Sequence, residues 1–93
     1  MTHITPGDKN IFEELGFDKA EAANLKMRSE LMIIVKQYIA ENKLTQEEAA
    51  SLMGVDQPRI NKLLRGKINL FTIDALIKML ERVDIHMRLK RVA

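Results

Sequence analysis

Residues 45–66 read TQEEAASLMGVDQPRINKLLRG, and this stretch decides the fold. Thr45 and Glu48 have the spacing of a capping box, which predicts that a helix begins at Thr45. Gly54 can adopt the positive φ that ends a helix and reverses the chain within about three residues. The stretch therefore predicts one short helix, a tight turn and the start of a second helix.

The second helix should cover residues 57–65, because Gly66 follows it at a position where glycine commonly ends a helix. Two helices that cross steeply need a small residue at the crossing and apolar residues behind it. The residues expected to pack the two helices together are Ala50, Gly54, Val55, Ile60 and Leu63. The pattern is typical of a helix-turn-helix at residues 45–65.

The outer face of the second helix is polar, and its residue types suit the edges of DNA bases. Glutamine can pair bidentately with adenine in the major groove, and arginine or lysine can pair with guanine. The residues expected to read bases are Gln57, Arg59, Asn61 and Lys62. The residues expected to contact phosphates are Thr45, Gln46, Arg65 and Lys67. Double-stranded DNA is therefore the predicted partner.

Further helices are predicted on both sides of this pair. Asp18 and Glu21 repeat the capping-box spacing, and a long helix should follow them to about Asn42. Residues 10–17 fit one short helical turn before that helix, and another helix should start after Thr72. The expected fold class is all-α.

The C-terminal segment, residues 83–93, changes to a period of two. Ile85, Met87 and Leu89 alternate with polar residues, which is the pattern of a β-strand. No other segment offers a convincing partner strand, and unpaired backbone groups favour pairing with another chain. We therefore expect this tail to form a strand that pairs across a homodimer; the alternative is a frayed basic tail.

Length and composition indicate one domain, expected at residues 10–82 after a flexible lead-in at residues 1–9. The 93 residues include no cysteine, which excludes a disulfide framework and any thiolate metal site. Eight of the 15 basic residues but only three of the 13 acidic residues lie at 61–93. Such asymmetry is expected where one face meets a polyanion, although chance clustering on a solvated surface is the alternative.

The sequence offers no constellation for catalysis, so no enzymatic activity, cofactor or metal is expected. The two histidines, His3 and His86, lie far apart in the lead-in and the tail, and no glycine-rich phosphate loop is present. The start of the chain lacks a secretory signal pattern. The longest apolar run, residues 31–35, is too short to span a membrane. A cytoplasmic protein without a membrane partner is expected.

Small, polar and apolar positions fall into one register over residues 44–66. The positions concerned are Leu44, Thr45, Gln46, Ala49, Ala50, Gly54, Val55, Gln57, Ile60 and Gly66. This register resembles the helix-turn-helix of the Xre/Cro/λ-repressor superfamily. The resemblance implies a five-helix λ-repressor-like fold, a homodimer on a palindromic operator, and regulation of transcription, most often repression. Pro58 departs from the pattern because it cannot donate to a base, which should shift readout toward Gln57 and Arg59.

Residues 10–17, the long helix after them, and residues 66–67 and 71–76 resemble the subgroup that contains HigA-like antitoxins. This resemblance implies a protein that represses its own operon and binds a RelE-like toxin. An alternative function is therefore a protein-interaction module that mainly neutralises an RNA-cleaving toxin. A solitary regulator without a ligand-binding domain also remains open.

The segment at residues 11–27 is the candidate surface for that alternative. Apolar residues that include Phe12 and Phe17 stand there beside acidic ones, and RNA-cleaving toxins are typically basic. The competing interpretation is that the two phenylalanines cover the domain's own core.

Overall fold

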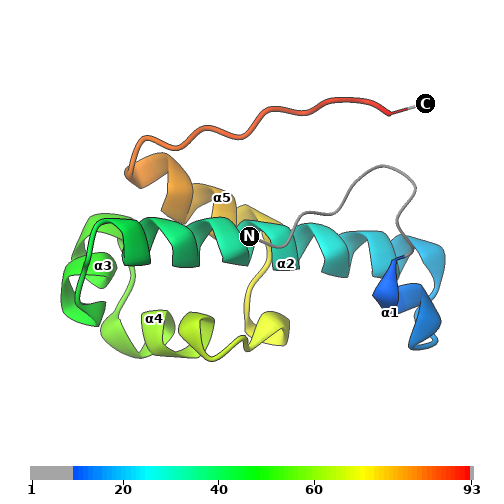
Figure 1. The fold of residues 1–93 in the computed structure, drawn as a ribbon, viewed down its shortest axis with the longest axis horizontal. Helices are drawn as coiled ribbons and strands as arrows, with labels where there is room; N and C mark the ends of the chain where they lie inside the picture. Colours follow the sequence, from blue (N-terminus) through cyan, green and yellow to red (C-terminus); the bar gives the residue numbers. More distant parts are fainter. Residues whose placement is uncertain (1–9, 93) are drawn as a thin grey trace.

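The computed structural model describes residues 10–92, which form five α-helices and one short 3₁₀ helix (Figure 1). The elements are α1 (Ile11–Glu14), α2 (Lys19–Glu41), α3 (Gln46–Met53), α4 (Gln57–Leu64), η1 (Ile68–Leu70) and α5 (Ile73–Arg82). The expected lead-in at residues 1–9 and the last residue of the expected tail lie outside the described residues. Within residues 10–92 there is no β-strand.

Polar side chains fix the starts of helices α2 to α5. Each accepts a hydrogen bond from a first-turn N–H group that the helix itself leaves without a partner. Asp18 caps α2 and Thr72 caps α5. Thr45 and Glu48 form the predicted capping box on α3, at 3.0 and 2.8 Å. Asp56 caps α4 at 2.9 Å, a role that the sequence analysis did not assign.

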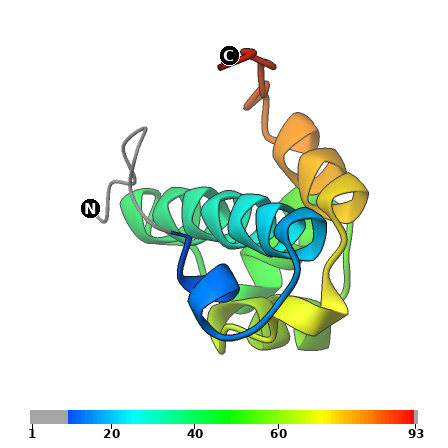
Figure 2. The ribbon, with the colours of Figure 1, turned by 90° about the vertical axis from the view of Figure 1, so that its right-hand side faces the viewer.

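Helix α2 runs through the middle of the molecule, with α3 and α4 on one side and α5 on another (Figures 1 and 2). The burial of apolar side chains from all four helices explains this arrangement. The main core consists of Leu31, Met32, Val35, Ile39, Ala49, Ala50, Met53, Ile60, Leu63, Phe71, Leu76, Met79 and Leu80.

Gly54 stands at the corner between α3 and α4, where the chain needs a backbone conformation that glycine adopts readily. Gly54 has a φ of 72°, in the left-handed region that favours glycine. The N–H groups of Gly54 and Val55 both donate to the carbonyl oxygen of Ala50. A Cβ atom on Gly54 would meet the far end of the exposed Arg82 side chain, which can move aside. Ile60 and Leu63 then lie fully buried on the inner face of α4.

A single arginine of α2 holds the segment that leaves α4. The guanidinium of Arg28 donates to the carbonyl oxygens of Ile68 at 3.3 Å and Phe71 at 3.4 Å. Its Nε atom donates to the side chain of Asn24 at 2.7 Å, which orients the guanidinium. The segment includes η1, which was not predicted from the sequence. Directly after η1, the Phe71 ring is buried in the core.

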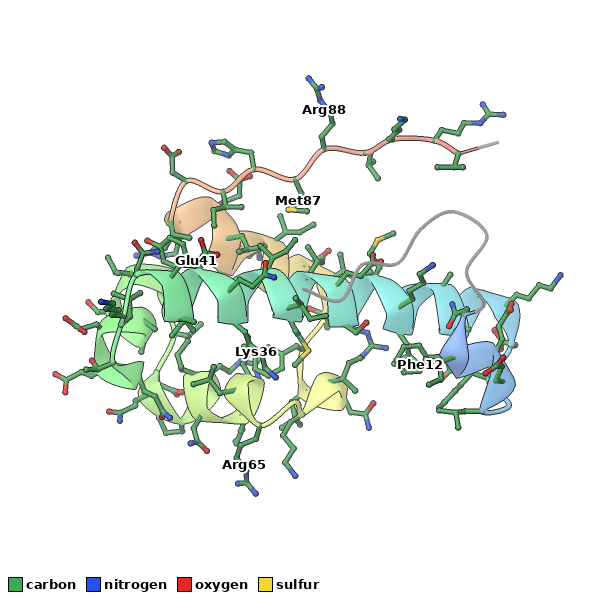
Figure 3. All side chains as sticks on the ribbon, in the orientation of Figure 1. Phe12, Lys36, Glu41, Arg65, Met87 and Arg88 are labelled. Carbon is green, nitrogen blue, oxygen red and sulfur yellow. The ribbon has the colours of Figure 1, made fainter. Side chains whose placement is uncertain are left out.

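The tail after α5 is extended and lies on the side of α2 opposite to α4 (Figures 1 and 2). Ile85 packs against the core, whereas Leu89 is 94% exposed. Figure 3 shows Met87 pointing toward the helices and Arg88 pointing away from them. The expected strand is not formed, because a strand needs a second strand to accept its ladder of hydrogen bonds and the single chain supplies none.

An exposed histidine ties the beginning of the tail to the end of α5. The His86 ring lies between two carboxylates, with Nδ1 2.9 Å from Glu81 and Nε2 3.1 Å from Asp84. The hydrogen bond and the charge of Glu81 raise the pKa of His86 above its ordinary value, with a smaller contribution from Asp84.

We predict that Gly54→Ala lowers the free energy of unfolding by about 1–2 kcal/mol, because alanine is strained at positive φ. Gly66→Ala is the matched control, since Gly66 has a nearly equal φ of 74° but open space around its Cβ position. Urea denaturation should show similar losses at the two glycines, because the backbone strain is the same and the exposed Arg82 side chain can move away from a Cβ atom on Gly54. A clearly larger loss at Gly54 that disappears in an Arg82→Ala background would contradict this and show that Arg82 is held in place.

Candidate nucleic-acid interface

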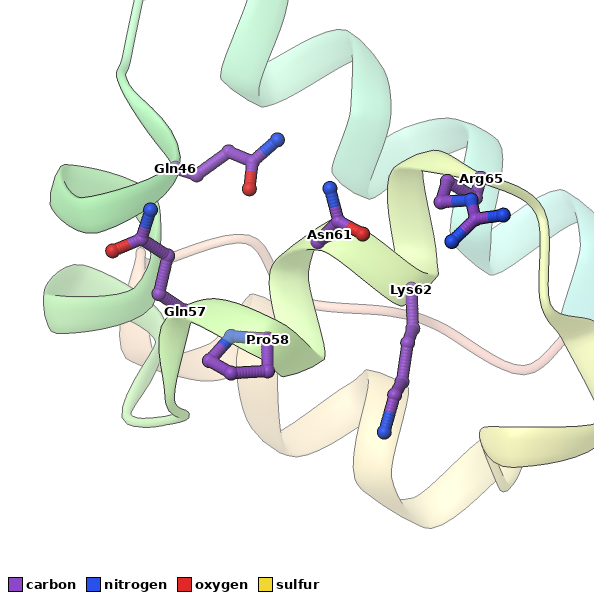
Figure 4. Close-up of a pocket in the computed structure, with 6 residues that line it drawn as sticks. All are labelled: Gln46, Gln57, Pro58, Asn61, Lys62 and Arg65. Carbon is purple, nitrogen blue, oxygen red and sulfur yellow. The ribbon is translucent and has the colours of Figure 1, made fainter.

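The N-terminal end of α3 and the outer face of α4 enclose an open concavity of about 410 Å³ (Figure 4). Its lining consists of Gln46, Gln57, Pro58, Asn61, Lys62 and Arg65. Gln46 belongs to α3, four of the other side chains come from α4, and Arg65 is the residue that caps the C-terminal end of α4. Five of the six were expected from the sequence to contact DNA, and the structure brings them to one surface.

Helical spacing explains why the α4 side chains stand together. Residues four apart lie on the same face of a helix. Gln57, Asn61 and Arg65 therefore form one row, and Pro58 and Lys62 form a second row beside it. Because Ile60 and Leu63 point into the core, α4 cannot rotate about its axis without exposing apolar surface. The outward direction of the polar rows is set by the core.

This surface is positively charged. Lys62, Arg65 and Lys67 are all exposed, and none of them pairs with a carboxylate in the part of the chain that the structure describes. In Figure 3 the side chain of Arg65 points away from the body of the molecule on the α4 side. Cations without intramolecular partners remain available to phosphate oxygens.

The start of α3 offers fewer donors than the sequence suggests. The Thr45 hydroxyl oxygen accepts the N–H of Glu48, and the Thr45 N–H donates to the Glu48 carboxylate. The capping box leaves the N–H groups of Gln46 and Glu47 without an acceptor among residues 10–92. Anion binding at this end therefore depends on those two N–H groups and on the Gln46 amide.

Arg59 is placed differently from the other expected base-reading residues. Its guanidinium lies over the ring of Phe71, 4.3 Å from the ring centroid, which is cation–π geometry. The side chain is half-buried and does not line the concavity. Arg59 thus links α4 to the segment after η1.

The expected dimerisation residues lie apart from this surface. Ile85, Met87 and Leu89 belong to the tail, on the far side of α2 (Figure 1). Among residues 10–92 there is no group of three or more side chains able to hold a metal ion. The helices of the described part are also too short or too polar for any of them to cross a membrane.

Comparison with known proteins agrees with this architecture. The model of a family described as a helix-turn-helix domain matches residues 11–90, which is most of the chain. No curated protein matches the chain. The matched region contains α3, the Gly54 corner and α4, the arrangement in which a helix-turn-helix presents its second helix to the major groove of DNA. The chain therefore belongs to this helix-turn-helix domain family.

Proposed function

We propose that the protein is a sequence-specific regulator of transcription that binds a palindromic DNA operator as a homodimer. The observation that carries this proposal is the outer face of α4, where amides and unpaired cations stand in two rows above a fully buried apolar face. Such a surface combines groups that read bases with groups that neutralise phosphates. A small all-helical helix-turn-helix domain is also typical of DNA-binding proteins that are not enzymes.

Each polar side chain of the concavity and of its surroundings has a proposed role. Gln57 and Asn61 pair with adenine, and Lys62 pairs with guanine. Gln46, Arg65 and Lys67 contact phosphates, whereas Thr45 contributes mainly through the helix that it caps. Arg59 reaches a base only if its guanidinium leaves the Phe71 ring, at a cost of about 0.5–1 kcal/mol. We therefore assign direct readout chiefly to Gln57, Asn61 and Lys62.

We predict that Asn61→Ala weakens binding to a selected operator by roughly ten-fold or more, with little change on random DNA, because one bidentate base contact is lost. Arg65→Ala should instead weaken binding to both duplexes and reduce the slope of log K against log salt by about 0.9. Fluorescence anisotropy at several salt concentrations measures both quantities.

Lys78→Ala is the matched control for charge, because Lys78 is an exposed cation on α5, across the core from α4. It should change neither the sequence preference nor, by more than a small amount, the affinity. Equal loss on both duplexes for Asn61→Ala would make Asn61 a phosphate contact, and selective loss for Arg65→Ala would make Arg65 a base reader.

The dimer is proposed from energetics and from the position of the tail. One short helix reads only a few base pairs, each worth about 1–3 kcal/mol of discrimination. Two such helices about 34 Å apart would read both halves of an operator. The tail carries exposed Leu89 and unpaired backbone groups on the side away from α4, so pairing of Ile85, Met87 and Leu89 with a second copy leaves the concavity free.

We predict that removing residues 86–93 yields a monomer that loses affinity for a two-half-site duplex but retains the fold, because Ile85 stays in the core. Light scattering measures the mass. Leu89→Ser should weaken the dimer, whereas Lys90→Ser, on the other face of the alternation, should not. A shortened chain that remains dimeric would rule out the tail as the joint.

Repression and an antitoxin role rest on the resemblance to Xre-type and HigA-like regulators. One structural observation favours the second role, namely an exposed apolar patch on and after α1. Ile11 is 61% exposed, Leu15 68% and Phe17 40%, and the acidic residues Glu13 and Asp18 adjoin them. The Phe12 ring meets the Phe17 ring edge-on at 6.3 Å, so Phe17 is only partly used inside the domain. A basic partner such as an RNA-cleaving toxin would complement this patch.

We predict that Leu15→Asp lowers the affinity for a basic RelE-like toxin by about ten-fold or more, since a central apolar contact is lost. Leu70→Asp is the control, because Leu70 is an exposed leucine on η1, outside the patch. Calorimetry with the full chain measures both affinities. Equal effects of the two substitutions, or no toxin binding at all, would remove this second function.

A further inference from the structure

Pro58 is the only apolar side chain among the six that line the concavity. It is exposed on the first turn of α4, and Figure 4 shows its ring between the Gln57 and Lys62 side chains on the outer surface of the helix. The residues around it can donate or accept hydrogen bonds, whereas the ring offers only carbon atoms to a ligand. An apolar group on a polar surface is suited to contact with an apolar feature of the DNA.

The backbone at this end of α4 is poorly suited to a phosphate. Proline has no N–H group, and the N–H of Arg59 donates to the Asp56 carboxylate at 2.9 Å. The exposed Asp56 carboxylate also places negative charge at the helix start, which repels phosphate. The first turn of α4 therefore favours the base edges in the groove over the DNA backbone.

The major groove presents one apolar group on a base edge, the C5-methyl group of thymine. We propose that the Pro58 ring contacts the methyl group of a thymine in each half-site, which makes Pro58 a specificity-determining residue. This inference rests on the proposed DNA-binding function and adds a base preference that hydrogen-bonding side chains do not supply.

Neighbouring side chains extend this preference along the groove. Asn61 lies three residues after Pro58, on the same side of the helix, and its amide is placed to read an adenine beside the thymine contact. Lys62 lies one further residue along, about 6 Å from Pro58 along the helix axis, or roughly two base-pair steps. Each half-site should thus hold A·T pairs at the start of α4 and a guanine toward its end.

The test uses the full chain and the duplex that it selects from a random pool. Each thymine is replaced singly by deoxyuridine, which removes the methyl group and leaves the hydrogen-bonding groups unchanged. We expect one deoxyuridine position per half-site to weaken binding about three- to five-fold, the effect of one buried methyl group. The same change should have little effect on Pro58→Ala, which keeps a good helix former in the first turn.

Two controls separate the methyl contact from other effects. Lys62→Ala should bind more weakly overall but retain the deoxyuridine effect, because Pro58 is intact. At the same position, a 5-methylcytosine·guanine pair should bind about three- to five-fold more tightly than cytosine·guanine in proteins that retain Pro58, but not in Pro58→Ala. Thermal unfolding of Pro58→Ala verifies that the fold is retained.

The outcomes distinguish this inference from the function on which it rests. Specific binding without a sensitive thymine, or a deoxyuridine effect that persists in Pro58→Ala, overturns the role of Pro58 and leaves the regulator intact. Failure to select any sequence overturns sequence-specific binding itself, and with it the inference.

Discussion

The turn between α3 and α4 is the constraint on which the remaining geometry depends. The Ala50 carbonyl oxygen accepts the N–H groups of Gly54 and Val55, which fastens the end of α3 and the corner at one point. Only two residues separate Gly54 from α4, so the backbone angles of Gly54 set the direction of the whole helix. Ile60 and Leu63 then reach the core at one crossing angle, and their burial holds the polar rows outward.

Helix α2 separates the two surfaces to which function is proposed. The concavity of α3 and α4 lies on one side of it, and the exposed tail lies on the other (Figures 1 and 2). A second chain bound to the tail would therefore not compete with DNA at α4. The patch on α1 stands at the far end of α2 from α3, which gives a third partner its own area. The surfaces proposed for the three partners therefore do not overlap.

Features that depend on residues one or two helical turns apart could be predicted from the sequence. Features that depend on contacts between distant segments could not. Helical spacing predicted that most of the side chains of the concavity share one surface. Pro58 was interpreted only as a lost donor, since its position as the one apolar side chain among polar ones exists only in the folded surface. The position of Arg59 depends on Phe71, twelve residues later, which the unpredicted η1 brings beneath it. Asp56 stands directly before the predicted start of the helix at Gln57 and has a residue type typical of an N-cap, but this role was not assigned from the sequence. The alternating pattern of the tail is typical of a β-strand, but a single chain offers no second strand with which it could pair.

Arg28 gives α4 a second support. The Gly54 corner anchors the beginning of the helix, and the Arg28 guanidinium grips two carbonyl oxygens just beyond its end, from a helix that contributes nothing to the concavity. Because α4 is held at both ends, a shift of either the Gly54 corner or the Arg28 contacts would change the tilt of the helix. If α4 binds DNA as proposed, a substitution at Arg28 would change the direction of all its outward side chains together without altering the identity of any of them.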